Sequence, residues 1–539
     1  MSLSVQTMAA IRFGYGIRPG ENPVSHKDDL LAQVLAGARA VPAFPREGLA
    51  ERWLAVPQLQ ADLSDSRKDA KAGTPNPEER KRVQQKAERT LRQDAGARVI
   101  QAVVSPNGFH ERLASFWVDH FSVLARKSFP TRLLTPLYEA EVIRPLLGGK
   151  FSDLLTAAIL HPAMLIYLDQ SRSVGPTSPG GAKRKAGLNE NLAREMLELH
   201  TLGAGSGYTQ SDVRAAAMVL TGISIDNETM RMEFRRGIAE PGRFSVLGTA
   251  YGSDKRTVDD ALRLLADLAA RPETVHYVCR KLVAHFIADT PPEEVMRPMR
   301  KAWIATGGDL TAVYAAMLDQ PRAWSDEGQK IKLPFDYVVS GLRALNAVDA
   351  GTLPIIDTEE EEADAPQPSA PKMGAAAPDM AGGKAVTAPA GDSMRPAGGM
   401  APAAAMAQMP PADGMTGPTK PPAQTKSAGT SPAPKKQNFA RALTSQALAR
   451  MGQPVWQPPS PAGFEEGFSV WVTPSQLAER IGWARQAARR LAGDQDPRDF
   501  LKAVLADAAR EDTIRIVGQA PNRLHAITMV LASPEFNRR

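Results

Sequence analysis

The spacing of hydrophobic residues along this chain follows the period of an α-helix in nearly every patterned stretch. Apolar residues recur at i, i+3, i+4 and i+7, which gives each predicted helix one apolar face. The pattern therefore predicts a mainly α fold, a large multi-helix body. The predicted helices, with ends placed to within about three residues, cover 27–37, 77–104, 108–124, 131–147, 151–160, 190–202, 210–221, 257–270, 273–288, 292–305, 309–319, 333–346, 438–450, 475–491, 497–508 and 521–532.

One region has the spacing of strands instead. The stretch "ISIDNETMRMEFRRG" and the "GRFSVLG" that follows it alternate apolar and polar residues across turn-forming residues. This alternation predicts one small β-hairpin near 223–247.

Residues 351–436 differ in composition from the rest of the chain. They consist mainly of Ala, Pro and Gly with scattered Met, and so little bulky apolar surface cannot offset the entropy of ordering the chain. We therefore predict a long disordered insertion between a main helical domain at 1–350 and C-terminal helices at 437–539. Because "LRAL" before the insertion and "ALARMGQ" after it read as two halves of one helical region, we expect the C-terminal helices to pack back on the main body.

The composition excludes several classes of protein. Lys and Arg number 65 against 59 Asp and Glu, and the small excess is spread along the chain, so we predict no nucleic-acid partner. Cys279 is the only cysteine, which excludes an internal disulfide and a cysteine-based zinc site. No apolar run reaches about 18 residues and the start lacks the features of a signal peptide, so we expect no membrane span and a cytoplasmic location, with export beside a signal-bearing partner left open.

The stretch "NENLAREMLELHTLG", residues 189–203, carries the first candidate chemistry. On a helical wheel Asn191, Glu195 and Glu198 fall within about 60° of one another, with Arg194 beside them. Two carboxylates at this spacing can ligate a divalent metal together or share a proton. They can equally belong to a structural polar network with Arg194. The sequence leaves both interpretations open.

Three residues elsewhere extend this candidate site. Tyr208 presents either a ring that packs across two helices or a hydroxyl that faces Glu195 and Glu198. His120 lies in the apolar stripe of "NGFHERLASFWVDHFSVL", where it is either a core histidine bonded to Asp119 or a backbone carbonyl, or a ligand or base that reaches the carboxylates. We count Asp119 as a further member of the polar network.

The glycines that follow this helix do not form a nucleotide site. Gly203, Gly205 and Gly207 come after a predicted helix rather than a strand, so the dinucleotide fingerprint is not met. No nucleotide cofactor is predicted.

Several longer motifs carry a family resemblance. They are "RFGYGIRPGE", "FWVDHFSV", "NENLAREMLELHTLGAGSGYTQSDVRAAAMVLTG", "RKLVAHFIADTPP", "KLPFDYVVSGLRAL", "LARMGQPVWQPPSPAGF" and "LASPEFNRR". With these motifs the chain resembles the bacterial family known as the domain of unknown function numbered 1800, over nearly its whole length. The resemblance implies a large, mostly helical protein, and it implies a partner from the family numbered 1501, which resembles alkaline-phosphatase-like hydrolases. It assigns no catalytic residue.

Two functional hypotheses follow. In the first, the protein is an accessory or scaffold protein that acts with the hydrolase-like partner, and Asn191, Arg194, Glu195 and Glu198 form a buried polar network. In the second, it is a metal-assisted hydrolase in which Glu195, Glu198 and His120 hold the metal, with Tyr208 nearby. Convergence of the three ligands on one point would separate the two hypotheses.

Overall fold

Helices dominate the computed structural model, which describes residues 3–71, 77–184, 187–325, 330–347 and 439–539. The predicted insertion at 351–436 lies outside the described residues. The first half of the chain contains α1 (Val5–Met8), η1 (Ala9–Phe13), α2 (Lys27–Arg39), α3 (Leu49–Lys71), α4 (Pro77–Val104), α5 (Gly108–His120), η2 (Ala125–Lys127), α6 (Phe129–Tyr138), η3 (Glu139–Ile143), α7 (Arg144–Leu146), α8 (Phe151–Leu160), α9 (Pro162–Tyr167), η4 (Gln170–Arg172), α10 (Pro179–Arg184), α11 (Asn191–Glu195), η5 (Met196–Thr201) and α12 (Gln210–Leu220).

The strands come next, followed by a second run of helices. The strands are β1 (Ile223–Ile225), β2 (Met232–Phe234), β3 (Phe244–Val246) and β4 (Thr249–Tyr251), with η6 (Arg236–Ile238) between the second and the third. The helices after them are α13 (Asp259–Ala270), α14 (Pro272–Phe286), α15 (Glu293–Thr306), α16 (Leu310–Leu318), η7 (Pro321–Trp324) and α17 (Pro334–Ala344). The C-terminal part contains α18 (Phe439–Leu443), α19 (Ser445–Arg450), α20 (Phe468–Trp471), α21 (Pro474–Leu491), α22 (Pro497–Leu505), η9 (Ala506–Ala508), α23 (Glu511–Gly518), α24 (Arg523–Ala532) and α25 (Pro534–Asn537).

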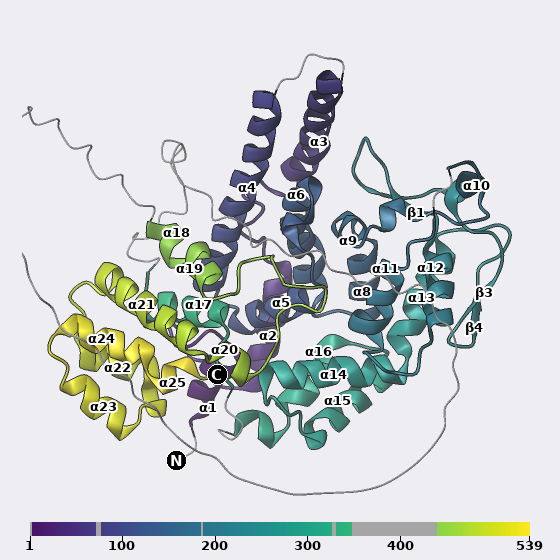
Figure 1. Ribbon diagram of the computed structural model, residues 1–539. Coiled ribbons are helices and arrows are strands. Elements are labelled where there is room, and N and C mark those ends of the chain that lie inside the picture. Colours follow the sequence, from purple (N-terminus) through teal and green to yellow (C-terminus); the bar gives the residue numbers. More distant parts are fainter. Residues whose placement is uncertain (1–2, 72–76, 185–186, 326–329, 348–438) are drawn as a thin grey trace, which may run out of the picture. The chain divides into compact units, whose positions relative to one another are not determined.

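The mainly α prediction is confirmed, and the misplaced elements have physical causes. The predicted helix 77–104 coincides with α4, and 151–160 coincides with α8. The helix α3 was missed because it contains Pro57, which reads as a helix break in the sequence. Figure 1 shows α3 beside α4, a contact that partners the apolar positions of α3.

The strand region contains two hairpins rather than the single one predicted. β1 pairs with β2 and β3 pairs with β4, both antiparallel, as separate two-stranded sheets. The first turn is held by Asp226, whose carboxylate accepts the backbone N–H groups of Glu228 and Thr229. The second turn uses Leu247 and Gly248, both at positive φ, as a two-residue hairpin turn requires.

The apolar residues gather into two large clusters. The first centres on α5, α8 and α14, with Trp117 fully buried and its indole N–H donating to the Tyr314 hydroxyl at 2.7 Å. The second joins α4 and α17 to the C-terminal helices α19, α21, α22 and α24. Among the described residues, no helix has both the length and the apolar character required to cross a bilayer.

The contact between α17 and α21 depends on a glycine. A Cβ atom on Gly341 would lie 2.3 Å from the ring of Trp483, which is closer than real carbon atoms approach. The Trp483 indole N–H donates to the Leu443 carbonyl at 3.0 Å, and the Tyr337 hydroxyl lies 3.1 Å from the Arg480 carbonyl. These contacts bring the segment after residue 439 onto α17 and, through it, onto α4.

Candidate functional site

The predicted carboxylate helix changes character in its middle. α11 ends at Glu195, and Met196–Thr201 is π-helical, with the Thr201 hydroxyl donating to the Met196 carbonyl at 2.7 Å. A π turn is wider than an α turn, so the 100° wheel used to group the side chains does not hold beyond Glu195. The Asn189 side-chain oxygen accepts the Asn191 N–H at 2.8 Å, just before the N-cap residue Glu190.

Arg194 and Asn191 bond away from the two carboxylates. Arg194 donates to Gln210 Oε1 at 2.7 Å and lies 3.7 Å from Glu190. The Asn191 amide faces the Leu168 carbonyl at 3.5 Å, a long hydrogen bond. The predicted polar network therefore divides, because Arg194 forms no ion pair with Glu195 or Glu198 among the described residues.

Glu195, Glu198 and Tyr208 do lie together, and with Arg194 they form what we call the acidic patch. All four side chains are partly exposed. Partial burial raises the pKa of Glu195, and the negative charge of Glu198 raises it further. Burial also raises the pKa of Tyr208, and the nearby Glu198 carboxylate raises it further. Both interpretations of Tyr208 find support, because its side chain packs against the first apolar cluster and the Glu198 carboxylate lies close enough to affect its pKa.

His120 does not join these carboxylates. Its ring is buried, and Nε2 lies 3.2 Å from the His200 carbonyl. Burial holds the pKa of His120 well below its ordinary value, so the ring is neutral near pH 7. In the part of the chain that the structure describes, no group of three or more His, Cys, Asp or Glu residues is placed to hold a metal ion. The trio of Glu195, Glu198 and His120 is therefore not assembled, because His120 faces the core from α5.

Asp119 lies in a different place, in an open pocket between segments that are far apart in the sequence. We call it the charged pocket. Its volume is about 60 Å³. It is lined by Arg98, Ser115, Val118, Asp119, Ser122, Val123, His285, Leu333, Phe335, Asp336, Gln453, Pro454, Val455, Trp456, Pro458, Phe464 and Glu466. The helices α4, α5, α14 and α17 supply one side, and the segment 453–466 supplies the other.

One wall of the charged pocket is a chain of buried ion pairs. Asp336 pairs with both Arg112 and Arg539. Arg539 also donates to Glu466 at 2.7 Å, and Glu466 accepts a hydrogen bond from His285 Nδ1 at 2.5 Å. Burial opposes ionisation of Asp336, but the two guanidinium groups outweigh it and lower its pKa to about 2. Each carboxylate of this wall is therefore paired with a cation.

His285 is the neutral member of that wall. Burial lowers its pKa to about 4, although the Glu466 carboxylate favours the charged form. Because a carboxylate only accepts, the imidazole carries its proton on Nδ1. The Nε2 atom has no hydrogen-bond partner among the described residues and is shielded from solvent. His285 thus fixes Glu466 in place rather than offering a base to the pocket.

Asp119 is the acid of the charged pocket whose pKa lies near neutral pH. Its Oδ1 accepts the Phe464 N–H at 2.7 Å, and Oδ2 has no partner among the described residues. Burial raises the pKa of Asp119 to about 7; Lys281 favours the charged form and Glu466 opposes it. A carboxyl group with this pKa is present in both protonation states at neutral pH.

Gly463 allows the 453–466 segment to reach Asp119. Its φ is +86°, and a Cβ atom built there would lie 2.6 Å from Asp119 Cγ. Ser122 holds the same segment by donating to the Pro461 carbonyl at 2.9 Å. The shape of the pocket around Asp119 therefore depends on a residue without a side chain.

Arg98 is the cation of the charged pocket. Its Nε donates to Glu139 Oε2 at 2.6 Å, and its guanidinium carbon lies 4.6 Å from the Phe335 ring centroid and 5.9 Å from that of Trp456. Trp456 Nε1 donates to the same Glu139 oxygen at 2.6 Å. The two terminal nitrogens of Arg98 have no hydrogen-bond partner among the described residues and retain solvent access. They remain available to a ligand.

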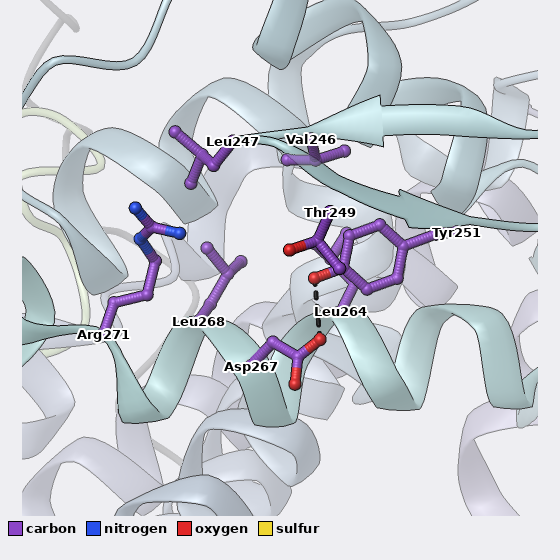
Figure 2. Close-up of a pocket in the computed structure, with 8 residues that line it drawn as sticks. All are labelled: Val246, Leu247, Thr249, Tyr251, Leu264, Asp267, Leu268 and Arg271. Atoms are coloured by element: carbon purple, nitrogen blue, oxygen red, sulfur yellow. Dashed lines mark hydrogen bonds between the residues drawn. The ribbon is translucent and has the colours of Figure 1, made fainter.

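A second, smaller hollow lies between the β3–β4 hairpin and α13. Figure 2 shows the Tyr251 hydroxyl pointing at Asp267, to which it donates at 2.8 Å. The hollow measures about 20 Å³, enough for about one water molecule. Tyr251 and Asp267 bond each other and Arg271 bonds Glu273, so the hollow fastens the hairpin to α13 rather than forming a site.

Sequence reasoning named Asp119 as a member of the polar network and as a bonding partner of His120, but it missed the neighbours of Asp119 in the pocket. Arg98 lies in a helix that reads as solvated because charges of both signs alternate along it, and Gln453 and Glu466 lie beyond the predicted insertion. His285 was assigned to packing alone. The one available signal was "FWVDHFSV", which puts an acid within an apolar stripe. A buried acid needs partners, but the pattern does not say which segments supply them.

The fold and the pocket together define a mainly helical protein with a charged pocket, one side of which comes from a segment of the C-terminal part. The chain belongs to the family described as "Protein of unknown function (DUF1800)", whose model matches residues 8–538. The resemblance drawn from the sequence motifs is confirmed by this match. No curated protein matches the chain, and no solved structure matches it.

Proposed function

We propose that the protein binds a small polar ligand in the charged pocket and that Asp119 exchanges a proton with this ligand. One observation carries the proposal: a carboxyl oxygen of Asp119 and the terminal nitrogens of Arg98, all without protein partners among the described residues, belong to residues that line the same open pocket. Binding sites combine an apolar lining with a few convergent polar groups. Val118, Phe335 and Trp456 provide such a lining here.

The electrostatics of the pocket support a functional role for Asp119. A residue with a strongly perturbed pKa in a cleft is a functional-site candidate. The charges of Asp336 and Glu466 are neutralised by their own partners, so they need nothing from a ligand. The Asp119 carboxyl group accepts a backbone N–H and interacts electrostatically with the more distant Lys281. A bound ligand can therefore change its protonation state.

A screen with a plugged variant tests this proposal. A library of small cationic, neutral and anionic molecules is mixed with the full-length protein, and binding is detected by saturation-transfer NMR. Val118→Phe fills the pocket, whereas Val41→Phe adds the same ring at a position that is 88% exposed. We expect hits that vanish with Val118→Phe and persist with Val41→Phe. An absence of hits, or hits that are indifferent to Val118→Phe, would refute the proposal.

The accessory role with a hydrolase-like partner of the family numbered 1501 is a second candidate. Apolar side chains exposed on α20 and α21 favour it: Phe468 is 51% exposed, and Leu477 and Ile481, one turn apart on α21, are 37% and 52% exposed. Exposed apolar groups of this kind are typical of protein contacts. Co-expression with such a partner should yield a complex that Leu477→Ser with Ile481→Ser weakens. A complex unchanged by the double substitution would argue against this surface.

A further inference from the structure

We infer that the charged pocket takes a carboxylate attached to a small apolar body, held by Arg98 and Gln453 and facing Asp119. This inference rests on the proposed binding function and specifies its ligand. The carboxylate could come from a free small acid or from the C-terminal residue of a peptide, and the chemistry of recognition is the same for both.

Arg98 is prepared to receive a planar anion. Its guanidinium is fixed by three contacts, the Glu139 carboxylate and the faces of Phe335 and Trp456. The terminal nitrogens of a guanidinium match the two oxygens of a carboxylate. Because the side chain is already ordered, little rotamer entropy is lost when the anion binds.

Gln453 adds a neutral donor beside this cation. Its Oε1 accepts the Phe335 N–H at 2.8 Å, which fixes the orientation of the amide. Its Nε2 has no partner among the described residues and retains solvent access. The apolar lining, Val118, Val455 and Pro454 among it, suits a short aliphatic or aromatic body.

The charge around Asp119 limits how negative the ligand can be. The charged and titratable groups around it are Arg98 of α4, His120 of α5, Lys281 and His285 of α14, Asp336 of α17 and Glu466 of the 453–466 segment. Glu466 and Asp336 are already anionic. A monoanion can be accepted if Asp119 takes up one proton, whereas a phosphate dianion would bring a second negative charge against the same carboxylates.

This arrangement couples binding to pH. Below about pH 7 Asp119 is protonated and presents a donor to the ligand. Above that pH a bound monoanion must draw a proton onto Asp119, so the affinity for a carboxylate falls as the pH rises, by up to about tenfold per pH unit. Asp119→Asn removes the titrating group and should leave an affinity that does not depend on pH.

Calorimetry on the full-length protein tests the inference with six probes: butyrate, its neutral analogue butyramide, butylamine, inorganic phosphate, and one short peptide prepared both with a free and with an amidated C-terminus. We expect butyrate to bind at least about tenfold more tightly than butyramide. Arg98→Gln should abolish binding, and Arg515→Gln, an exposed matched control, should not. Because Arg98→Gln alters a buried pair, Asp119→Asn supplies a second readout through the lost pH dependence.

Each outcome of these experiments either supports or overturns the inference. Butyrate binding with these properties supports a free acid, and binding of the free-terminus peptide alone supports a peptide source for the same carboxylate. If phosphate, butyramide or butylamine binds as tightly as butyrate or more tightly, the inference is overturned. If Val118→Phe abolishes that binding, the proposed function still stands although the inference fails. Failure of every probe and of the wider screen overturns both.

Discussion

The charged pocket and the acidic patch both contain a carboxyl group with a raised pKa, but they are built in different ways. In the patch, Glu195 and Glu198 come from one short helix, stay partly exposed and repel each other. In the pocket, Asp119 faces groups that arrive from four helices and a distant segment. The comparison shows that two acids close in sequence are weaker evidence of a site than one acid that distant segments enclose.

The largest expected difference between the two regions is in stability. Asp336→Ala removes the anion shared by Arg112 and Arg539 and leaves two guanidinium groups buried without it. Breaking a buried ion pair in this way costs about 3–5 kcal/mol. Urea unfolding should report a loss of that size. A loss below about 1 kcal/mol would show that this wall of the pocket is not the structural element we describe.

Asp119→Asn should change how stability depends on pH. The pKa of Asp119 is raised from 3.8 to about 7 in the folded state, so the folded protein holds a proton that the unfolded chain releases. Its favourable contribution is complete below about pH 4 and is lost as the pH rises to 7. The wild type should therefore lose up to about 4 kcal/mol relative to Asp119→Asn between pH 4 and pH 8. Urea unfolding at both pH values measures this, with Asp494→Asn as the exposed control; parallel curves for wild type and Asp119→Asn would contradict it.

Gly463→Ala should distort the pocket without removing any of its charged groups. The added methyl group would meet Asp119 at 2.6 Å in a backbone conformation with φ of +86°. Overpacking of this kind costs about 1–3 kcal/mol. Gly467→Ala is a matched control, because it also has positive φ but no atom near its Cβ position. Thermal unfolding should place Gly463→Ala below Gly467→Ala, and equal midpoints would argue against a tight approach of the segment to Asp119.

Substitutions in the acidic patch should have the smallest effects. Glu195→Gln removes a repulsion with Glu198 in a partly exposed setting, so stability should change by no more than about 0.5 kcal/mol, in the favourable direction. Tyr208→Phe, which removes the hydroxyl near Glu198, should cost less than about 1 kcal/mol. Chemical denaturation measures both. A loss of several kcal/mol from either change would contradict this prediction, because the patch would then contribute as much to stability as the pocket.

Local patterns predicted most of the helices because apolar spacing and end signals lie within a few residues of each other. Thr209 and Asp212 form a capping box at the start of α12, and the Asn189 side chain accepts the N–H of Asn191, the first residue of α11. The π turn at Met196–Thr201 was not predictable, because nothing in that stretch distinguishes it from an α turn. The helix α3 was not predicted because Pro57 indicates a helix break in the sequence, whereas tertiary packing keeps the helix intact.

The candidate site was predictable only in part. "FWVDHFSV" marked Asp119, but its partner residue Phe464 lies 345 positions further along the chain. No spacing rule connects residues at that distance. The acidic patch attracted attention because Arg194, Glu195 and Glu198 lie in one continuous helical segment, and helical proximity is the relation that a single sequence displays best.

The measurement that most directly separates pocket from patch is a carbon-detected NMR titration of the side-chain carboxyl groups, with Asp119→Asn used for assignment. The Asp119 resonance should titrate with a midpoint of about 7 and move to higher pH when butyrate is added, while the resonances of the patch stay where they are. A midpoint near the ordinary value for an aspartate, unmoved by butyrate, would contradict the assignment of the charged pocket as the functional site.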